Sequence, residues 1–241
     1  MAVRHKLITS FIIGQLFSLL EDEEWLLWGS DTLLKVRDEM LLGVYFDRSR
    51  WQDIFYVEVF VRPLYWPPED WVFGLCSGMG PGWELTSDRR RASAANEIAS
   101  LMNRQVIPLF SELRTARDVV AHSLRHPNHP VTGIARRGWD TVSHEVLGYM
   151  AAWSGRRILA SILLRAASKE RRADDDESKM LRTHVKQTLH LLSRPGELHD
   201  MLQQTADRVR RSLRLESARP IRDVRERRGG PMSGGGPDPG V

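Results

Sequence analysis

Apolar and polar residues alternate between residues 53 and 62, where the chain reads DIFYVEVFVR. A period of two places neighbouring side chains on opposite faces of a β-strand. One face of this segment is uniformly apolar and the other is mixed, which predicts a strand with one side against the hydrophobic core. The apolar face carries Phe55, Val57, Val59 and Val61.

Three further segments near this one have the composition of strands. Residues 32–37 and 40–47 are rich in apolar and β-branched residues, and they flank a short polar turn at Asp38 and Glu39. Residues 71–76, WVFGLC, form the fourth segment. Because strands so close together in the chain are joined by hairpins, the sequence predicts a four-stranded antiparallel β-meander.

A first helix is predicted before the sheet. The apolar run from Leu7 to Leu20 repeats at helical spacing, so one side of the helix is expected to pack on the sheet. Basic residues at positions 4–6 precede the run, as in a signal peptide, but an acidic cluster at residues 21–24 follows in place of a cleavage site. A run of 14 residues is also too short to span a bilayer, so no membrane partner is expected.

Helical patterns replace the strand patterns after Ser87, which is a good N-cap residue. Four or five helices are predicted, with a helical hairpin that turns near Ser154 and Gly155. The sequence thus predicts an α+β fold in which an N-terminal helix packs on the sheet, followed by an α-helical region and a disordered basic tail. The three predicted parts are residues 1–86, 87–216 and 217–241, the last rich in Arg, Gly and Pro.

Charge and cysteine content narrow the choice of compartment and partner. The net charge of +4 comes entirely from residues 205–241, which hold nine Arg and five acidic residues. This tail has no interleaved aromatics, so we expect at most weak, non-specific nucleic-acid binding. The single cysteine, Cys76, cannot form an internal disulfide, and 30 Arg against five Lys indicate a GC-rich genome. A cytoplasmic bacterial protein is therefore predicted.

Few residues are spaced for catalysis. Asp118, His122 and His126 are four residues apart and share one face of a helix, which makes a metal-dependent hydrolase the alternative interpretation. The glycine-rich stretch after the fourth strand lacks the Lys and hydroxyl residue of a phosphate-binding loop, so it predicts a turn. No catalytic residue, resident metal or cofactor is assigned.

Aromatic residues concentrate in the connection after the third strand. Tyr65 and Trp66 lie between Pro63 and Pro67, and Trp71 follows Pro68; the prolines are expected to hold residues 64–69 extended. Three environments are open to the Trp66 and Trp71 rings: under the loop, against the first helix, or on the surface as anchors for a partner. Burial as a lid on the sheet edge is the more common outcome for such rings. We assign Tyr65, Trp66 and Trp71 as the candidate partner-binding residues.

Residues 144–167 resemble one tetratricopeptide unit. Leu147 and Gly148, followed by Ala160, Leu164 and Ala167, stand where that family places its small and large packing residues, while His144 and Ala151 depart from its pattern. The resemblance implies a protein-binding helical scaffold, and the alternative is an ordinary helical hairpin. The sequence therefore predicts a non-catalytic protein–protein interaction module whose partner is another protein.

Overall fold

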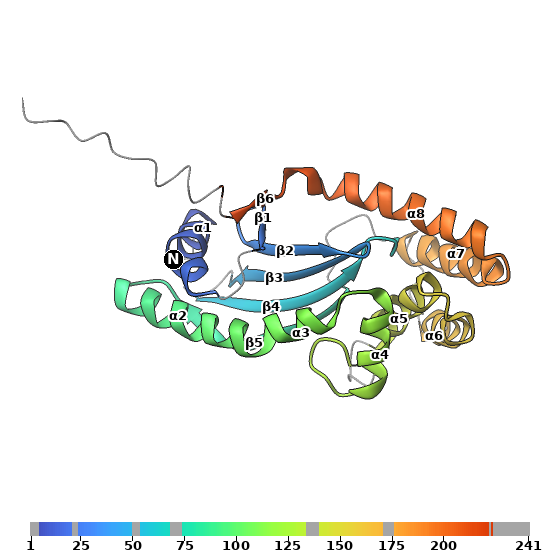
Figure 1. The fold of residues 1–241 in the computed structure, drawn as a ribbon, viewed down its shortest axis with the longest axis horizontal. Coiled ribbons are helices and arrows are strands. Elements are labelled where there is room, and N and C mark those ends of the chain that lie inside the picture. Colours follow the sequence, from blue (N-terminus) through green and yellow to red (C-terminus); the bar gives the residue numbers. More distant parts are fainter. Residues whose placement is uncertain are drawn as a thin grey trace, which may run out of the picture.

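The computed structural model is an α+β fold, as the sequence predicts (Figure 1). It describes residues 5–20, 24–49, 54–67, 74–133, 140–170, 176–221 and 223. A twisted antiparallel sheet lies at the centre, and helices cover one of its faces and extend beyond one end of its strands. One hydrophobic cluster contains residues of both the sheet and the helices. The predicted division of the chain at residue 86 stays a prediction.

The sheet has six strands among the described residues, so the predicted number of four is wrong. Neighbouring strands are antiparallel throughout, in the order β5-β4-β3-β2-β1-β6. Strands β2 to β4 lie where the alternation predicts them. The strands are β1 (Leu26–Trp28), β2 (Thr32–Arg37), β3 (Met40–Arg48), β4 (Ile54–Pro63), β5 (Leu75–Glu84) and β6 (Arg219–Pro220).

Strand β5 occupies the glycine-rich stretch that the sequence predicts as a turn. Gly82 leaves room for the bulky side chains of β4: a Cβ there would lie 3.0 Å from Ile54 Cδ1 and 3.2 Å from Tyr56 Cε1. Gly80 has a φ of +73° and lies where the pairing with β4 shifts register. Glycine therefore marks a bulged edge strand here. Residues 71–73 of the predicted strand lie outside the described residues.

Strand β6 comes from the segment predicted to be disordered. Arg219 and Pro220 pair with the short strand β1, and the N–H of Ile221 donates to the carbonyl of Trp25 at 3.0 Å. The Ile221 side chain is 0% exposed. The prediction of disorder from residue 217 is therefore wrong for 217–221, and residues after Asp223 lie outside the described part of the chain.

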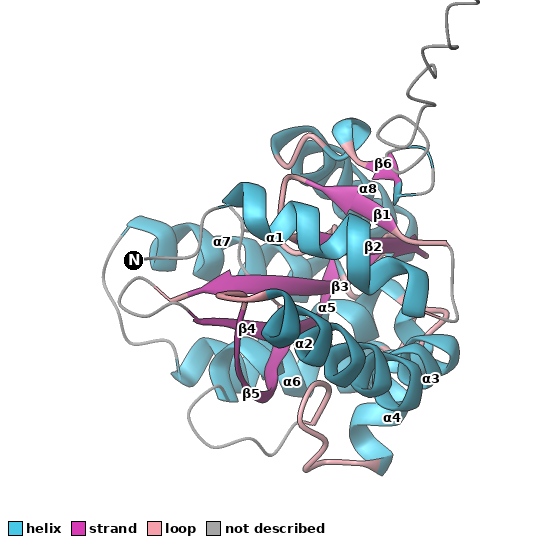
Figure 2. Cartoon of the chain, turned by 90° about the vertical axis from the view of Figure 1, so that its left-hand side faces the viewer, coloured by secondary structure: helices cyan, strands magenta, loops and turns pink. Residues whose placement is uncertain are grey.

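The apolar face of the sheet is covered by α1 (His5–Phe11) and α2 (Asp88–Leu101), which lie in front of the strands in Figure 2. The Phe11 and Phe55 ring centroids are 5.7 Å apart, and Trp83 Nε1 donates to Glu97 Oε2 on α2 at 3.1 Å. The first helix is shorter than predicted, because after Phe11 the chain continues as a π-helical turn, Ile12–Leu16, and a 3₁₀ turn, Phe17–Leu19.

The helical region contains more helices than the four or five predicted. Ser87 caps α2, as predicted, by accepting the Arg90 N–H. A separate α4 begins at Thr115, whose side chain and that of Asp118 form a capping box. After α2 and a π-helical turn, Met102–Val106, come α3 (Ile107–Glu112), α4 (Ala116–Arg125), α5 (Asp140–Trp153), α6 (Arg157–Glu170), α7 (Asp176–Leu191) and α8 (Pro195–Ser212).

The turn between β2 and β3 ties the helices to the sheet. Asp38 and Glu39 both have positive φ, 46° and 58°, as a tight hairpin turn requires. Asp38 Oδ2 accepts the Ala116 N–H at 2.9 Å, at the start of α4, and Glu39 Oε2 pairs with Arg210 on α8 at 2.7 Å. Helices α5 to α8 gather beyond this end of the strands (Figure 1).

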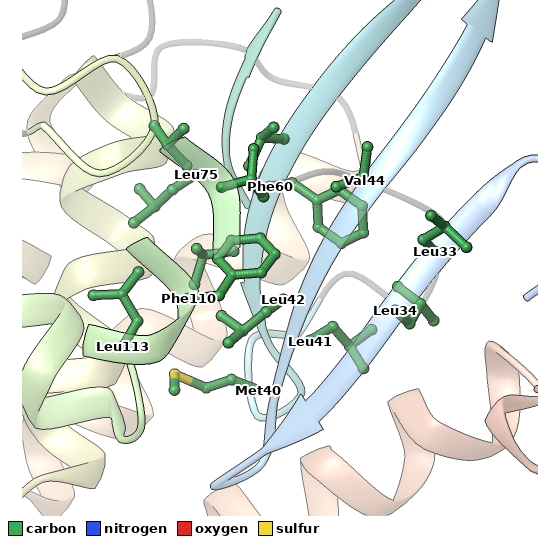
Figure 3. Packing of buried hydrophobic residues seen from close by; sticks show 14 of the residues in the cluster. Leu33, Leu34, Met40, Leu41, Leu42, Val44, Phe60, Leu75, Phe110 and Leu113 are labelled. Atoms are coloured by element: carbon green, nitrogen blue, oxygen red, sulfur yellow. The ribbon is translucent and has the colours of Figure 1, made fainter. Parts of the chain in front are cut away.

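The end of α3 completes the core beside this turn. Phe110 and the following Leu113 point toward Met40 and Leu42 of β3 (Figure 3), and all four side chains are buried. Arg37 Nη1 also donates to the carbonyl of Phe110 at 3.3 Å. The helical region is thus fixed to the sheet by both apolar and polar contacts.

Candidate interaction surface

The aromatic residues predicted to bind a partner are buried where the structure describes them. Tyr65 is 0% exposed and Trp66 is 1% exposed. Trp66 Nε1 donates to Glu145 Oε1 on α5 at 3.0 Å, and the Arg62 guanidinium lies 5.5 Å from the Trp66 ring centroid. Both rings are therefore buried and not exposed to a partner, and the contacts hold α5 against the end of β4. Trp71 lies outside the described residues.

Tyr65 continues this contact into the helical region. Its ring stacks on Trp153 at 4.6 Å with an interplanar angle of 10°, and the Trp153 ring lies 4.7 Å from that of His199 on α8. Burial, with the charges of Asp38 and Glu39, raises the pKa of the Tyr65 phenol well above its usual range. The phenol therefore stays neutral and serves to connect the sheet with α5 and α8.

The candidate metal ligands are engaged in other contacts. Asp118 Oδ2 accepts the N–H and hydroxyl of Thr115, both at 2.9 Å, and so belongs to the cap of α4. His122 is buried, with Nδ1 2.8 Å from Thr132 Oγ1, whereas His126 is exposed at the helix end. Burial and the nearby His126 lower the pKa of His122. Within the described ranges, no group of three His, Cys, Asp or Glu residues is arranged to hold a metal ion.

A second group of titratable side chains lies on the mixed face of the sheet. Tyr45 and Glu58 are direct neighbours on β3 and β4. Burial, followed by the charges of Asp31 and Asp47, raises the pKa of Tyr45 to about 12, and burial with Asp47 raises the pKa of Glu58. Both groups therefore hold their protons to higher pH than usual. This pattern is found in structural clusters as well as in active sites.

Helices α5 and α6 form the predicted hairpin, which turns at Gly155, a residue with a φ of +75°. They cross closely because α5 has Gly148 at the contact: a Cβ there would lie 2.7 Å from Leu164 Cγ and 3.2 Å from the Leu164 backbone nitrogen. Gly148 and Leu164 are two of the residues that carry the tetratricopeptide resemblance. Their contact shows a close-packed helical hairpin.

Replacing Gly148 by alanine is expected to force these helices apart. We expect the strain to cost about 1–3 kcal/mol, which exceeds the gain of about 1 kcal/mol in helix propensity. The matched control is Gly196→Ala in α8, where a Cβ would meet no atom within 4 Å and stability should rise. Urea denaturation of both variants measures the difference. Equal stability of Gly148→Ala and the unmodified chain would contradict the close crossing.

A buried polar network joins α5, α7 and α8. The Thr205 hydroxyl donates to the Met201 carbonyl at 3.0 Å, so Thr205 Oγ1 accepts from His184 Nε2 at 3.3 Å. His184 Nδ1 is then the acceptor of the Tyr149 hydroxyl at 2.7 Å. Burial, with a smaller effect from Arg208, lowers the pKa of His184 to about 4. The network therefore requires a neutral imidazole.

Acid is expected to weaken this network. A histidine with a pKa of about 4 in the folded chain and 6.5 when unfolded contributes fully to stability above pH 6.5. Between pH 6.5 and pH 4 the unfolded chain binds more protons than the folded chain does. The free energy of unfolding therefore drops by about 3 kcal/mol as the pH falls toward 4. Denaturation of the unmodified chain, His184→Gln and the exposed control His190→Gln at each pH tests this. If His184→Gln keeps the same pH slope as the other two proteins, His184 does not cause it.

Among the residues that the structure describes, the most exposed large apolar side chains lie on α6. Ile158 is 80% exposed and Ile162, one turn further, is 60% exposed. The opposite side of the helix is buried against α5 through Ala160 and Leu164. Our sequence reasoning missed this surface, although the segment RILASILLR carries the signal. Its five Ile and Leu residues are too many for one buried stripe, so some must face outward.

Comparisons of this chain with protein-family models, with curated proteins and with solved structures gave no match. None of the helices in the described part of the chain has the length and apolar character needed to cross a membrane. Functional assignment therefore depends on the chain's own geometry.

Proposed function

We propose that this chain is a protein–protein interaction module that presents α6 to its partner. The observation that carries the proposal is the pair of exposed isoleucines, Ile158 and Ile162, on one line of the helix surface. Exposure of neighbouring apolar side chains to water is unfavourable, and apolar surface patches mark sites that a partner covers. The tetratricopeptide resemblance of residues 144–167 favours the same use.

The contacts around α6 hold its exposed side in a fixed position. Its inner side packs on α5 at the Gly148 and Leu164 contact, and α5 is joined to the sheet by the buried hydrogen bond from Trp66 to Glu145. Tyr149 on α5 further links to α7 through His184. A surface held in this way loses little conformational entropy when a partner binds, which favours affinity.

Replacing Ile158 and Ile162 together by aspartate is expected to abolish partner capture without unfolding the chain, because both side chains already face solvent. An affinity pull-down from lysate with mass spectrometry compares the double variant with the unmodified chain. Leu124→Asp is the matched control, since Leu124 is 47% exposed on α4, away from α6. Circular dichroism verifies folding. The same set of captured proteins for all three chains would overturn the proposal.

Weak nucleic-acid binding through the basic end of the chain is the second candidate. Arg208, Arg211, Arg214 and Arg219 are exposed at the end of α8 and on β6. A contact of this kind depends on phosphate charge and weakens steeply with salt. It predicts retention on a DNA column at low salt that falls when Arg211 and Arg214 are replaced by glutamate.

A further inference from the structure

We infer that the partner segment bound by α6 is an acidic amphipathic helix that lies antiparallel to α6; this inference rests on the proposed function. At 3.6 residues per turn, positions 158, 162, 165 and 169 lie along one line of the helix. That line reads Ile158, Ile162, Arg165 and Lys169, and the last two side chains are exposed. The surface is thus apolar in its first half and cationic in its second.

The cations on this line are available to a partner. Arg165 Nε donates to Ser161 Oγ at 3.1 Å, which is a neutral contact on the same helix. None of the ion pairs formed between described residues involves Arg165, Lys169 or the neighbouring Arg157. The first turn of α6 contains no acidic residue either. Carboxylates from a partner would therefore meet cations that are not already in an ion pair with a described acidic side chain.

Charge disfavours a second copy of this chain as the occupant. Two α6 helices packed in parallel would place Arg165 and Lys169 against the same cations of the other copy. Packed antiparallel, Lys169 would face Ile158 and Arg165 would face Ile162, so neither cation gains a counter-charge. Both arrangements leave charges that must be desolvated without compensation, which is costly.

An antiparallel acidic helix can make a favourable contact with each of the four α6 side chains at positions 158, 162, 165 and 169. Its first two turns would oppose Lys169 and Arg165, and its next two turns would oppose Ile162 and Ile158. Acidic residues in the first turn of a helix are also stabilised by that helix's own dipole. The expected partner pattern is therefore two acidic positions four residues apart, followed three residues later by two large apolar positions four apart.

A displayed library of 16-residue helical peptides, randomised on one face, tests the inference against the immobilised full-length chain. We expect enriched peptides to carry Asp or Glu in the first two turns and Leu or Ile after them. Their binding should fall at least tenfold on the Ile158→Asp/Ile162→Asp variant. The charge-reversed variant Arg165→Glu/Lys169→Glu should select Lys and Arg at the same positions.

The possible outcomes separate this inference from the proposed function. Enriched peptides that need the isoleucines but show no excess of acid overturn the inference alone. Enrichment that is equal on the Ile158→Asp/Ile162→Asp variant overturns both. Sedimentation showing a dimer that the same variant dissolves would make a second copy the occupant. Binding of phosphatidylglycerol vesicles that both double variants abolish, without any peptide enrichment, would make a lipid surface the occupant. Either result overturns the acidic helix.

Discussion

Replacing Trp66 by alanine is expected to lower the free energy of unfolding by about 3–5 kcal/mol, the usual cost of removing a fully buried large aromatic side chain. The ring is 1% exposed and is covered by the Arg62 guanidinium. Its Nε1 also donates to the buried Glu145 carboxylate, so the variant removes one hydrogen bond of a buried charge. Trp66→Ala is therefore a stability variant, and it cannot serve to test binding alone.

Two further variants test this expectation by comparison with Trp66→Ala. Trp66→Phe keeps most of the apolar contact and removes the donor, so it should cost about 1–3 kcal/mol. Tyr56→Ala removes a ring that is 40% exposed on β4 and should cost less than either. Chemical denaturation measures the free energy of unfolding of all three variants. If Trp66→Ala unfolds at the same denaturant concentration as the unmodified chain, Trp66 does not hold α5 on the sheet.

Ending the chain after Glu216 is expected to cost about 2–5 kcal/mol, as for deletion of a large buried aliphatic side chain. The truncation removes β6, its pairing with β1, and Ile221, whose side chain is fully buried. The hydrogen bond from the Ile221 N–H to the Trp25 carbonyl is lost with it. Edge strand β1 would then expose its unpaired backbone groups.

A second, shorter truncation and a point variant separate the strand from the tail. Ending the chain after Asp223 keeps β6 and Ile221, so its stability should match that of the full chain. Ile221→Ala in the full chain should reproduce most of the loss seen after Glu216. Thermal and urea denaturation measure the stability of each of these chains. If ending the chain after Glu216 leaves stability unchanged, β6 is not an integral part of the sheet. The DNA-column test of the basic end must for this reason use arginine substitutions and not the cut after Glu216.

The elements with strong local signals could be predicted from the sequence. Strand β4 follows from period-two alternation, β2 and β3 follow from their apolar and β-branched composition, and the start of α2 follows from Ser87, because all these signals come from neighbouring residues. The turn of the α5–α6 hairpin follows from Ser154 and Gly155 for the same reason. One helix boundary was missed although its signal is also local. Thr115 separates α4 from α3 by a capping box that the apolar pattern does not reveal.

Trp66 and Ile158 show that local sequence patterns do not predict which apolar residues are buried. Both Trp66 and Ile158 are large and apolar, and the sequence gives no reason to bury one and expose the other. Trp66 is buried because Glu145 of α5 accepts its N–H, 79 residues along the chain. Ile158 is exposed because α6 packs its other side on α5. Our sequence-based choice of a partner site therefore included Tyr65 and Trp66, which the fold uses internally.

The sequence by itself determined the α+β class, the antiparallel central strands and the order of the helical elements, since these depend on side-chain periodicity and caps within short segments. Only the tertiary structure decided that a glycine-rich stretch and the residues Arg219–Pro220 become strands, because each is a strand solely by pairing with a partner. It also decided which apolar residues reach solvent. Burial depends on contacts between segments far apart in the chain, and no local pattern records them.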